Sequence, residues 1–107
     1  MTTVRVVRLG LSALVWAEGV LDGAVAPELH ETMEGLVGIQ PRSVVLDLSS
    51  VPRIDHGAMA VLAAAAARLG HLGVPLELRL PAGREVTVGD AHSLREVLSV
   101  AYPPRER

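Results

Sequence analysis

The stretch SVVLDLSSVPRIDHGAMAVLAAAAARLG, residues 43–70, decides the fold of this chain. It begins with a short apolar run, Val44–Leu48, whose β-branched residues and small length favour a buried central strand over a helix. A loop with a proline follows, and then an alanine-rich segment that is long enough for a helix. The stretch therefore predicts a buried strand that leads into a helix packed against it.

The junction between these two elements carries a residue suited to start the helix. Asp55 directly precedes the alanine-rich segment, and an aspartate at this position accepts hydrogen bonds from backbone N–H groups of the first turn. We expect the donor to be Gly57 or Ala58. The helix is predicted to run to about Leu69, where the glycines that follow end it.

Two strands and a helix are predicted on the N-terminal side. Val4–Leu9 and Ala13–Glu18 are rich in β-forming residues and flank a turn that contains glycine, as in a hairpin. Pro27 suits the first turn of a helix, and Gly38 is the expected stop. This helix presents one apolar stripe at helical spacing, formed by Leu29, Met33, Leu36 and Val37.

On the C-terminal side, Val74–Leu80 alternates apolar with charged residues, as a half-exposed strand does. The order of strand, helix, strand, helix and strand predicts a parallel sheet. Glu85–Val88 suits a fifth strand, which makes Pro81–Arg84 either a shortened crossover or a hairpin turn. The sequence leaves these two structures of residues 81–92 open.

The last predicted element is a closing helix. Ser93 and Glu96 have the spacing of a capping box, which predicts a helix through Val100. Residues 102–107 combine prolines with charged residues and have little to bury, so they are predicted to be a flexible tail. Residues 1–101 then form one domain, in keeping with a length of 107 residues.

Composition excludes several classes of function. The formal net charge is -2 and no basic residues cluster, which argues against nucleic acid as a partner. The absence of cysteine excludes disulfides, thiolate catalysis and a zinc finger. No stretch reaches the roughly 20 apolar residues that span a bilayer, and the N-terminus does not resemble a signal peptide. We therefore expect a cytoplasmic protein that does not insert into a membrane.

Three segments resemble the STAS domain family, and in particular the bacterial anti-sigma factor antagonists. They are Glu18–Asp22, Val44–Leu48 and Ile54–Ala58, which follow one another as the family's motifs do, within about residues 4–80. The resemblance implies a small α/β domain with a four- to five-stranded mixed sheet and helices packed mainly on one face. The C-terminal third fits less well, because Pro81–Asp90 replaces a helix that the family has after the fourth strand.

The junction departs from the family pattern at its regulatory position. The family has I-D-S-S-G, and here the residues are Ile54-Asp55-His56-Gly57-Ala58, so Gly57 stands where a partner kinase phosphorylates the second serine. Glycine has no hydroxyl, so the resemblance implies binding that is not switched by phosphorylation at this position. Ser49 and Ser50 lie nearby and stay open as alternative phosphosites.

Acidic residues raise the question of catalysis. Asp22, Asp47 and Asp55 fall near ends of elements that a parallel topology brings to one edge, where carboxylates can exchange protons or hold Mg²⁺. Each also has a structural explanation, as a turn residue, a strand-end acceptor and a helix cap respectively. The four histidines are dispersed along the chain. We therefore expect no enzymatic activity, no cofactor and no metal site.

The alanine-rich helix has no charged face before Arg68. An apolar helix is normally buried, here under neighbouring helices. In a domain this small, an exposed strip of alanines is also a surface on which a partner helix or a second copy packs. The sequence leaves both interpretations open, and with them whether the protein forms a homodimer.

The leading functional hypothesis is a non-enzymatic regulatory module that binds an anti-sigma factor or serine kinase. Its predicted partner surface comprises Asp22, Arg53, Asp55, His56, Gly57, Ala58, Met59 and the adjoining helix face. The alternative is an accessory subunit of a membrane transport system with a transporter component as partner, since free-standing STAS proteins also serve beside lipid or anion transporters. A small-ligand sensor is disfavoured, because aromatic and convergent polar residues are few.

Overall fold

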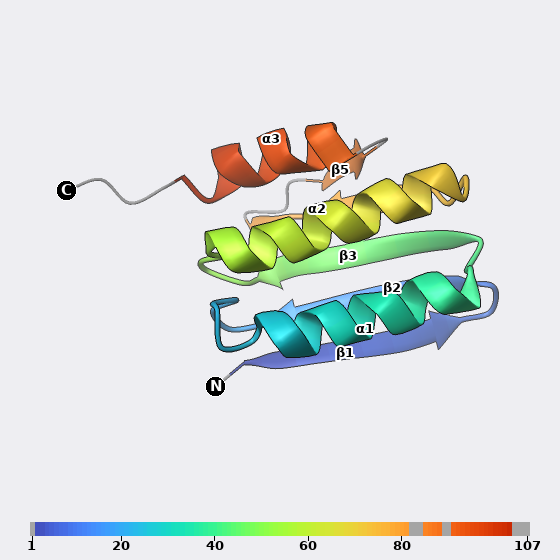
Figure 1. Cartoon of the computed structure of the whole chain (residues 1–107), viewed down its shortest axis with the longest axis horizontal. Helices are drawn as coiled ribbons and strands as arrows, with labels where there is room; N and C mark the ends of the chain where they lie inside the picture. Colours follow the sequence, from blue (N-terminus) through green and yellow to red (C-terminus); the bar gives the residue numbers. More distant parts are fainter. Residues whose placement is uncertain (1, 82–84, 89–90, 104–107) are drawn as a thin grey trace.

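The structure is a computed structural model that describes residues 2–81, 85–88 and 91–103. This part of the chain contains a five-stranded sheet and three helices (Figure 1). In chain order the elements are β1 (Thr3–Leu9), β2 (Ser12–Glu18), α1 (Ala26–Ile39), β3 (Ser43–Ser50), α2 (His56–His71), β4 (Leu76–Arg79), β5 (Glu85–Val88) and α3 (Ala91–Ala101).

The sheet is mixed, and its strands lie in chain order from β1 to β5. The three central strands β2, β3 and β4 are parallel to one another, as the alternation of strands and helices predicts. The outer strands β1 and β5 are antiparallel to their neighbours. β4 and β5 therefore form a hairpin, and the alternative of a shortened crossover before β5 is wrong.

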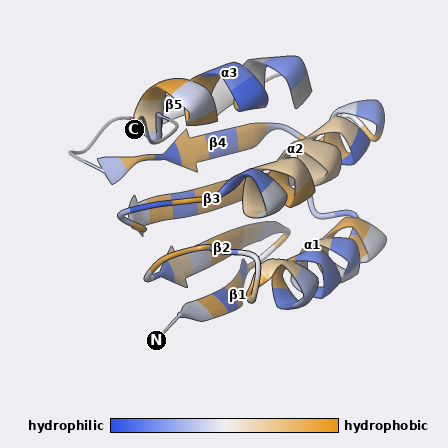
Figure 2. Cartoon of the chain, turned by 60° about the vertical axis from the view of Figure 1, so that its left-hand side comes forward, coloured by the Kyte–Doolittle hydropathy of each residue, from blue (hydrophilic) through white to orange (hydrophobic). Residues whose placement is uncertain are grey.

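All three helices lie on one face of the sheet, as Figures 1 and 2 show. The crossovers through α1 and α2 both step in the same direction along the sheet, from β2 to β3 and from β3 to β4. Because such crossovers are right-handed, two steps in one direction place both helices on the same side. α3 packs beside α2, with Leu94 and Leu98 fully buried.

The core lies between this helical layer and the inward side chains of the strands. The burial of β2 and β3 alternates residue by residue, so each strand turns one set of side chains to the helices. The predicted apolar stripe of α1 is confirmed, because all four of its members are buried. The largest fully buried side chains are Leu21, Leu29, Leu46, Leu48, Leu62, Leu69, Leu78, Leu80, Leu94, Leu98, Val15 and Val44.

The alanine-rich helix α2 lies between α1 and α3 and contacts both of them (Figure 1). Ala58, Ala65 and Ala66 are buried against the core together with leucines of the same helix. Ala60 and Ala64 are exposed. Burial therefore dominates, as the first interpretation predicts, and a narrow strip of small residues is open to solvent; the packing of a partner on this strip stays a prediction.

Helix ends differ from the predictions at three places. α2 runs through Gly70 to His71, beyond its predicted end at about Leu69. α1 continues past Gly38 to Ile39, and Gln40 takes the left-handed conformation, with φ 47°, that glycine usually supplies at a helix end. The predicted capping box is wrong, because α3 begins at Ala91 and Ser93 lies inside it. The spacing of Ser93 and Glu96 alone does not show whether Ser93 precedes the helix as its cap or lies within its first turn.

The prediction of a flexible tail from residue 102 onward is wrong at Tyr102. The side chain is only 6% exposed, and its hydroxyl donates to the carbonyl oxygen of Val51 at 2.9 Å. The backbone N–H of Tyr102 donates to Leu98 and so continues α3. Tyr102 therefore belongs to the packed domain, while residues 104–107 of the predicted tail lie outside the described residues.

Candidate functional site

A backbone bridge brings together the two loops that form the candidate site. Leu21 pairs with Ile54 in an isolated parallel bridge. The N–H of Leu21 donates to the carbonyl of Arg53 at 3.0 Å, and the N–H of Asp55 donates to the carbonyl of Leu21 at 2.9 Å. The loop after β2 is therefore fixed beside the start of α2, although more than 30 residues of sequence separate them.

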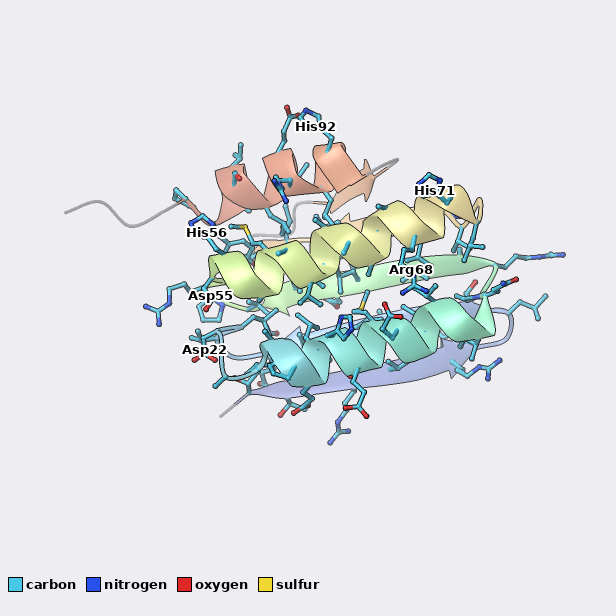
Figure 3. The ribbon with its side chains drawn as sticks, viewed as in Figure 1. Asp22, Asp55, His56, Arg68, His71 and His92 are labelled. Atoms are coloured by element: carbon cyan, nitrogen blue, oxygen red, sulfur yellow. The ribbon has the colours of Figure 1, made fainter. Side chains whose placement is uncertain are left out.

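Two aspartates lie on the same side of this junction, as Figure 3 shows. The Oδ1 atom of Asp22 accepts a hydrogen bond from the N–H of Ala24 at 3.1 Å, which makes it a turn residue. The Oδ1 atom of Asp55 accepts from the N–H of Ala58 at 3.0 Å, which confirms the predicted cap of α2. Both carboxylates thus have structural partners among the backbone N–H groups.

These loops, the first turn of α2 and the C-terminal end of α3 enclose an open groove of about 500 Å³. We call it the junction groove. Tyr102 closes one wall, and its hydroxyl holds the chain at Val51, just before the residues that line the groove. The groove is lined by Val20, Asp22, Arg53, Ile54, Asp55, His56, Met59, Tyr102 and Pro103.

The junction groove gathers most of the residues that the sequence predicted for a partner surface. Gly57 lies exposed beside it. The prediction that Ala58 belongs to the partner surface is wrong, because its side chain is fully buried. Sequence reasoning missed Tyr102 and Pro103, which come from the far end of the chain.

A second hollow of about 280 Å³ adjoins the junction groove between α2 and α3. It shares His56 and Met59 with the groove and adds Arg95 and Ser99 from α3. The amphipathic pattern of α3 predicts that a polar face is exposed, but nothing in the sequence places that face beside the junction. The packing of α3 on α2 decides this neighbourhood.

The remaining carboxylates and histidines do not join this site. Asp47 is directed to the opposite face of the sheet, where its Oδ1 atom accepts from the N–H and the hydroxyl of Ser49. His92 pairs with Glu96 on the exposed side of α3. Across the described ranges, no three or more side chains of histidine, aspartate or glutamate gather in a way that could hold a metal ion.

An ion pair between helices lies away from the groove. Arg68 of α2 donates to Glu34 of α1, and this hydrogen bond lowers the pKa of the Glu34 carboxyl below its usual value. Both side chains are exposed, so solvent screens the pair and its contribution to stability is small. We infer that the role of this ion pair is to help align α1 with α2.

The cap of α2 supports a first prediction. Asp55→Ala removes the acceptor of the Ala58 N–H and is expected to lower the free energy of unfolding by about 1 kcal/mol. Asp55→Asn keeps an acceptor oxygen at the same position and should retain most of the stability. Urea unfolding followed by circular dichroism measures both, and an alanine variant as stable as the wild type would contradict the role of the cap.

Comparisons with known proteins agree on the fold. A family model described as "Mlab, STAS domain" matches residues 4–101. An anti-sigma factor antagonist from Mycobacterium paratuberculosis is similar in structure, with a TM-score of 0.70 and 21% identity over 96% of this chain and 84% of that one. The unphosphorylated anti-sigma factor antagonist SpoIIAA has a TM-score of 0.62 and 9% identity, over 71% of each chain.

A third similar structure belongs to a much longer chain. The structure of Mglu matches with a TM-score of 0.64 and 32% identity over 73% of this chain, which spans only 19% of the Mglu chain. No curated protein matches this sequence. In the part of the chain that the structure describes, none of the helices is long and apolar enough to cross a membrane.

Proposed function

Because the chain belongs to the STAS domain family, we propose that it is a regulatory module that binds a partner protein at the junction groove, without a phosphorylation switch at position 57. The observation that carries the proposal is the groove itself. A backbone bridge holds the Asp22 loop beside the start of α2, so Arg53, His56 and Met59 surround one concave surface.

The chemistry of the groove supports a protein partner. His56 and Arg53 are exposed and can donate hydrogen bonds, while Met59 is half-buried and offers a flexible apolar contact. Asp22 and Asp55 are already bonded to backbone N–H groups of their own loops. The groove therefore combines a rigid frame with a few adaptable side chains, which suits binding more than proton transfer, and we propose that the protein is not an enzyme.

The geometry at Gly57 supports the absence of a switch. A Cβ atom placed on Gly57 would lie 3.5 Å from the Oδ1 atom of Asp55, which is an ordinary contact. The backbone therefore has room for a Cβ atom at this position, and the family's acceptor hydroxyl is missing because the residue is glycine. A partner kinase finds no hydroxyl to modify at this position, so binding at the groove is constitutive.

The nature of the partner divides the proposal into two candidates. The first is an anti-sigma factor or serine kinase, which the structural similarity to anti-sigma factor antagonists favours, in a cytoplasmic setting. The second is a component of a membrane transport system, to which the protein would be an accessory subunit. The family description, which names Mlab and not an antagonist, and the glycine at position 57 keep this candidate open.

The experiment that separates the candidates is a pull-down from a lysate of the organism that encodes the chain. Wild type is compared with Gly57→Asp, which places a negative charge on the exposed rim of the groove. Gly57→Ala controls for the added Cβ atom. Gly38→Asp places the same residue on an exposed glycine of α1 that has nothing within 4 Å, and so controls for charge elsewhere.

We expect wild type, Gly57→Ala and Gly38→Asp to capture the same partner, and Gly57→Asp to lose most of it. An anti-sigma factor or kinase identified by mass spectrometry supports the first candidate. A permease or transport ATPase supports the second. A partner that all four proteins capture equally would show that binding does not use the junction groove.

A further inference from the structure

We infer that the face of the sheet opposite the helices joins two copies of this chain into a symmetric dimer. This inference uses a different surface from the junction groove and does not depend on the proposed function. In the part of the chain that the structure describes, helices cover only one face of the sheet (Figure 2). The strands turn their alternate side chains to the other face, which we call the open face.

The strand register identifies the side chains of the open face. Partners across neighbouring strands share a face, so the row through Trp16 contains Arg5, Asp47 and Arg79. The neighbouring row, through Leu14, contains Val7, Val45 and Glu77. The two rows belong to one surface, because Arg79 donates from its Nε atom to Glu77 across them at 3.2 Å.

One part of the open face, over β1, β2 and β3, is apolar. Val7 is 43% exposed and Leu9 is 59% exposed, and they lie beside the half-buried Leu14, Trp16 and Val45. Trp16 is the only tryptophan of the chain, and it stands on this surface and not in the core. Contiguous apolar surface that includes a large aromatic residue is typical of a protein interface.

The topology gives a further reason to expect that another protein layer packs on the open face. β2, β3 and β4 are parallel, and parallel strands are usually covered on both faces. Here the two crossovers step in one direction, which commits their helices to a single face. A second copy supplies the missing layer, with two sheets packed about 10 Å apart.

A two-fold rotation brings two positions of each row against complementary positions of the other row. The two-fold axis lies between the two sheets, runs perpendicular to the strands, and passes midway between the two rows. Each strand then lies over the same strand of the second copy, and each row lies over the other row. Leu14 then packs on the Trp16 position of the second copy, and Glu77 faces the Arg79 position, twice by symmetry. Asp47 and Arg5 come to face the apolar positions of Val45 and Val7. The Oδ1 atom of Asp47 keeps the hydrogen bonds from Ser49, and Arg5 lies exposed on the edge strand β1, where its side chain can stay in solvent.

The area of the open face fits a dimer of moderate strength. Five strands, three of them seven or eight residues long, present a plane of roughly 480 Å². Side chains that rise from the plane increase this area, so two copies bury about 1,000 Å² or slightly more in total, near the lower limit for a specific interface. An interface near this limit is typical of weak association, so we expect a monomer–dimer equilibrium that depends on the protein concentration.

Sedimentation equilibrium of the full chain tests the inference, together with the fluorescence of Trp16. We expect a monomer–dimer equilibrium, and a shift of the tryptophan emission to shorter wavelength as the protein concentration rises. Leu14→Glu should shift the equilibrium to monomer by at least about tenfold in the dissociation constant. Val100→Glu, which changes a 68% exposed valine of α3 away from the open face, should dimerise like the wild type.

A charge exchange tests the symmetry without changing the apolar residues of the open face. Arg79→Glu places two acidic residues opposite each other in the dimer and should weaken it, whereas the double variant Glu77→Arg and Arg79→Glu restores opposite charges and should recover the wild-type dimer. Circular dichroism confirms that each variant is folded. A wild type that stays monomeric to about 1 mM, or a Leu14→Glu variant that is folded and still dimeric, would overturn the inference.

Discussion

Tyr102→Phe is expected to lower the free energy of unfolding at neutral pH by about 1–3 kcal/mol, although it removes a single oxygen atom. The hydroxyl of Tyr102 donates to the carbonyl oxygen of Val51 at 2.9 Å, inside the core. Phenylalanine keeps the ring and its packing but leaves this buried acceptor without its donor. Tyr102→Ala also creates a cavity and should cost about 3–5 kcal/mol. Urea unfolding measures both variants.

The same residue should control the stability of the protein in alkali. The chain has one tyrosine and no cysteine, and all ten of its lysine-plus-arginine residues are arginine, so Tyr102 is the one side chain that titrates between about pH 10 and pH 12. Burial raises the pKa of Tyr102 from 10.0 to about 12.

The sign of the effect follows from the two pKa values. In the unfolded chain the hydroxyl loses its proton near pH 10, whereas in the folded protein it keeps the proton to about pH 12. The unfolded state therefore binds fewer protons in this window, and the stability that is fully present below pH 10 falls as the pH rises. Tyr102→Phe should show no such decrease. A phenylalanine variant that loses stability in parallel with the wild type would contradict this role of Tyr102.

Ala66→Asp is expected to destabilise the domain far more than Ala64→Asp, although both residues lie in the same helix two positions apart. Ala66 is 4% exposed and packs in the core, so an aspartate there either buries an unpaired charge or forces its side chain to take up a proton. The expected loss is at least about 3 kcal/mol, and the variant is expected to be largely unfolded or insoluble.

Ala64→Asp is the matched control, with the same intrinsic helix propensity and the same added group. Ala64 is exposed, and Arg68 follows it by one helical turn, so the new carboxylate stays hydrated beside a cation. Its cost should stay below about 1 kcal/mol. Equal destabilisation by the two substitutions, measured by urea unfolding, would mean that α2 is not packed with the face that the structure shows.

Several features of the fold were open to prediction because they depend on neighbours in the sequence. The spacing of the apolar residues of α1 follows the helical repeat, and the alternation in β2 and β3 follows the pleat of a strand. Asp55 caps α2 through a backbone N–H only three residues away. The motifs of the family, and the glycine at position 57, are likewise properties of short segments.

The candidate site was predicted only in part. Asp22, Arg53, Asp55, His56 and Met59 do line one groove, because the bridge between Leu21 and Ile54 brings the motifs together. The burial of Ala58 depends on how α2 is rotated over the sheet, and the sequence around it is too uniformly apolar to fix that rotation. The carboxylate of Asp47 points to the opposite face, because the pleat alternates from Leu46 to Leu48.

The sequence by itself determined the order of the strands and helices, the aspartate cap of α2, and that position 57 has no hydroxyl to modify. Only the tertiary structure decided that Tyr102 closes the junction groove, and that the helices of the described residues cover one face of the sheet and leave the other open. Tyr102 meets Val51 across 51 residues of sequence, and the open face results from the direction of two successive crossovers. Both features depend on packing between segments that are distant in the sequence. A local pattern of residues indicates whether a segment is buried or exposed, but it does not indicate which other segment packs against it.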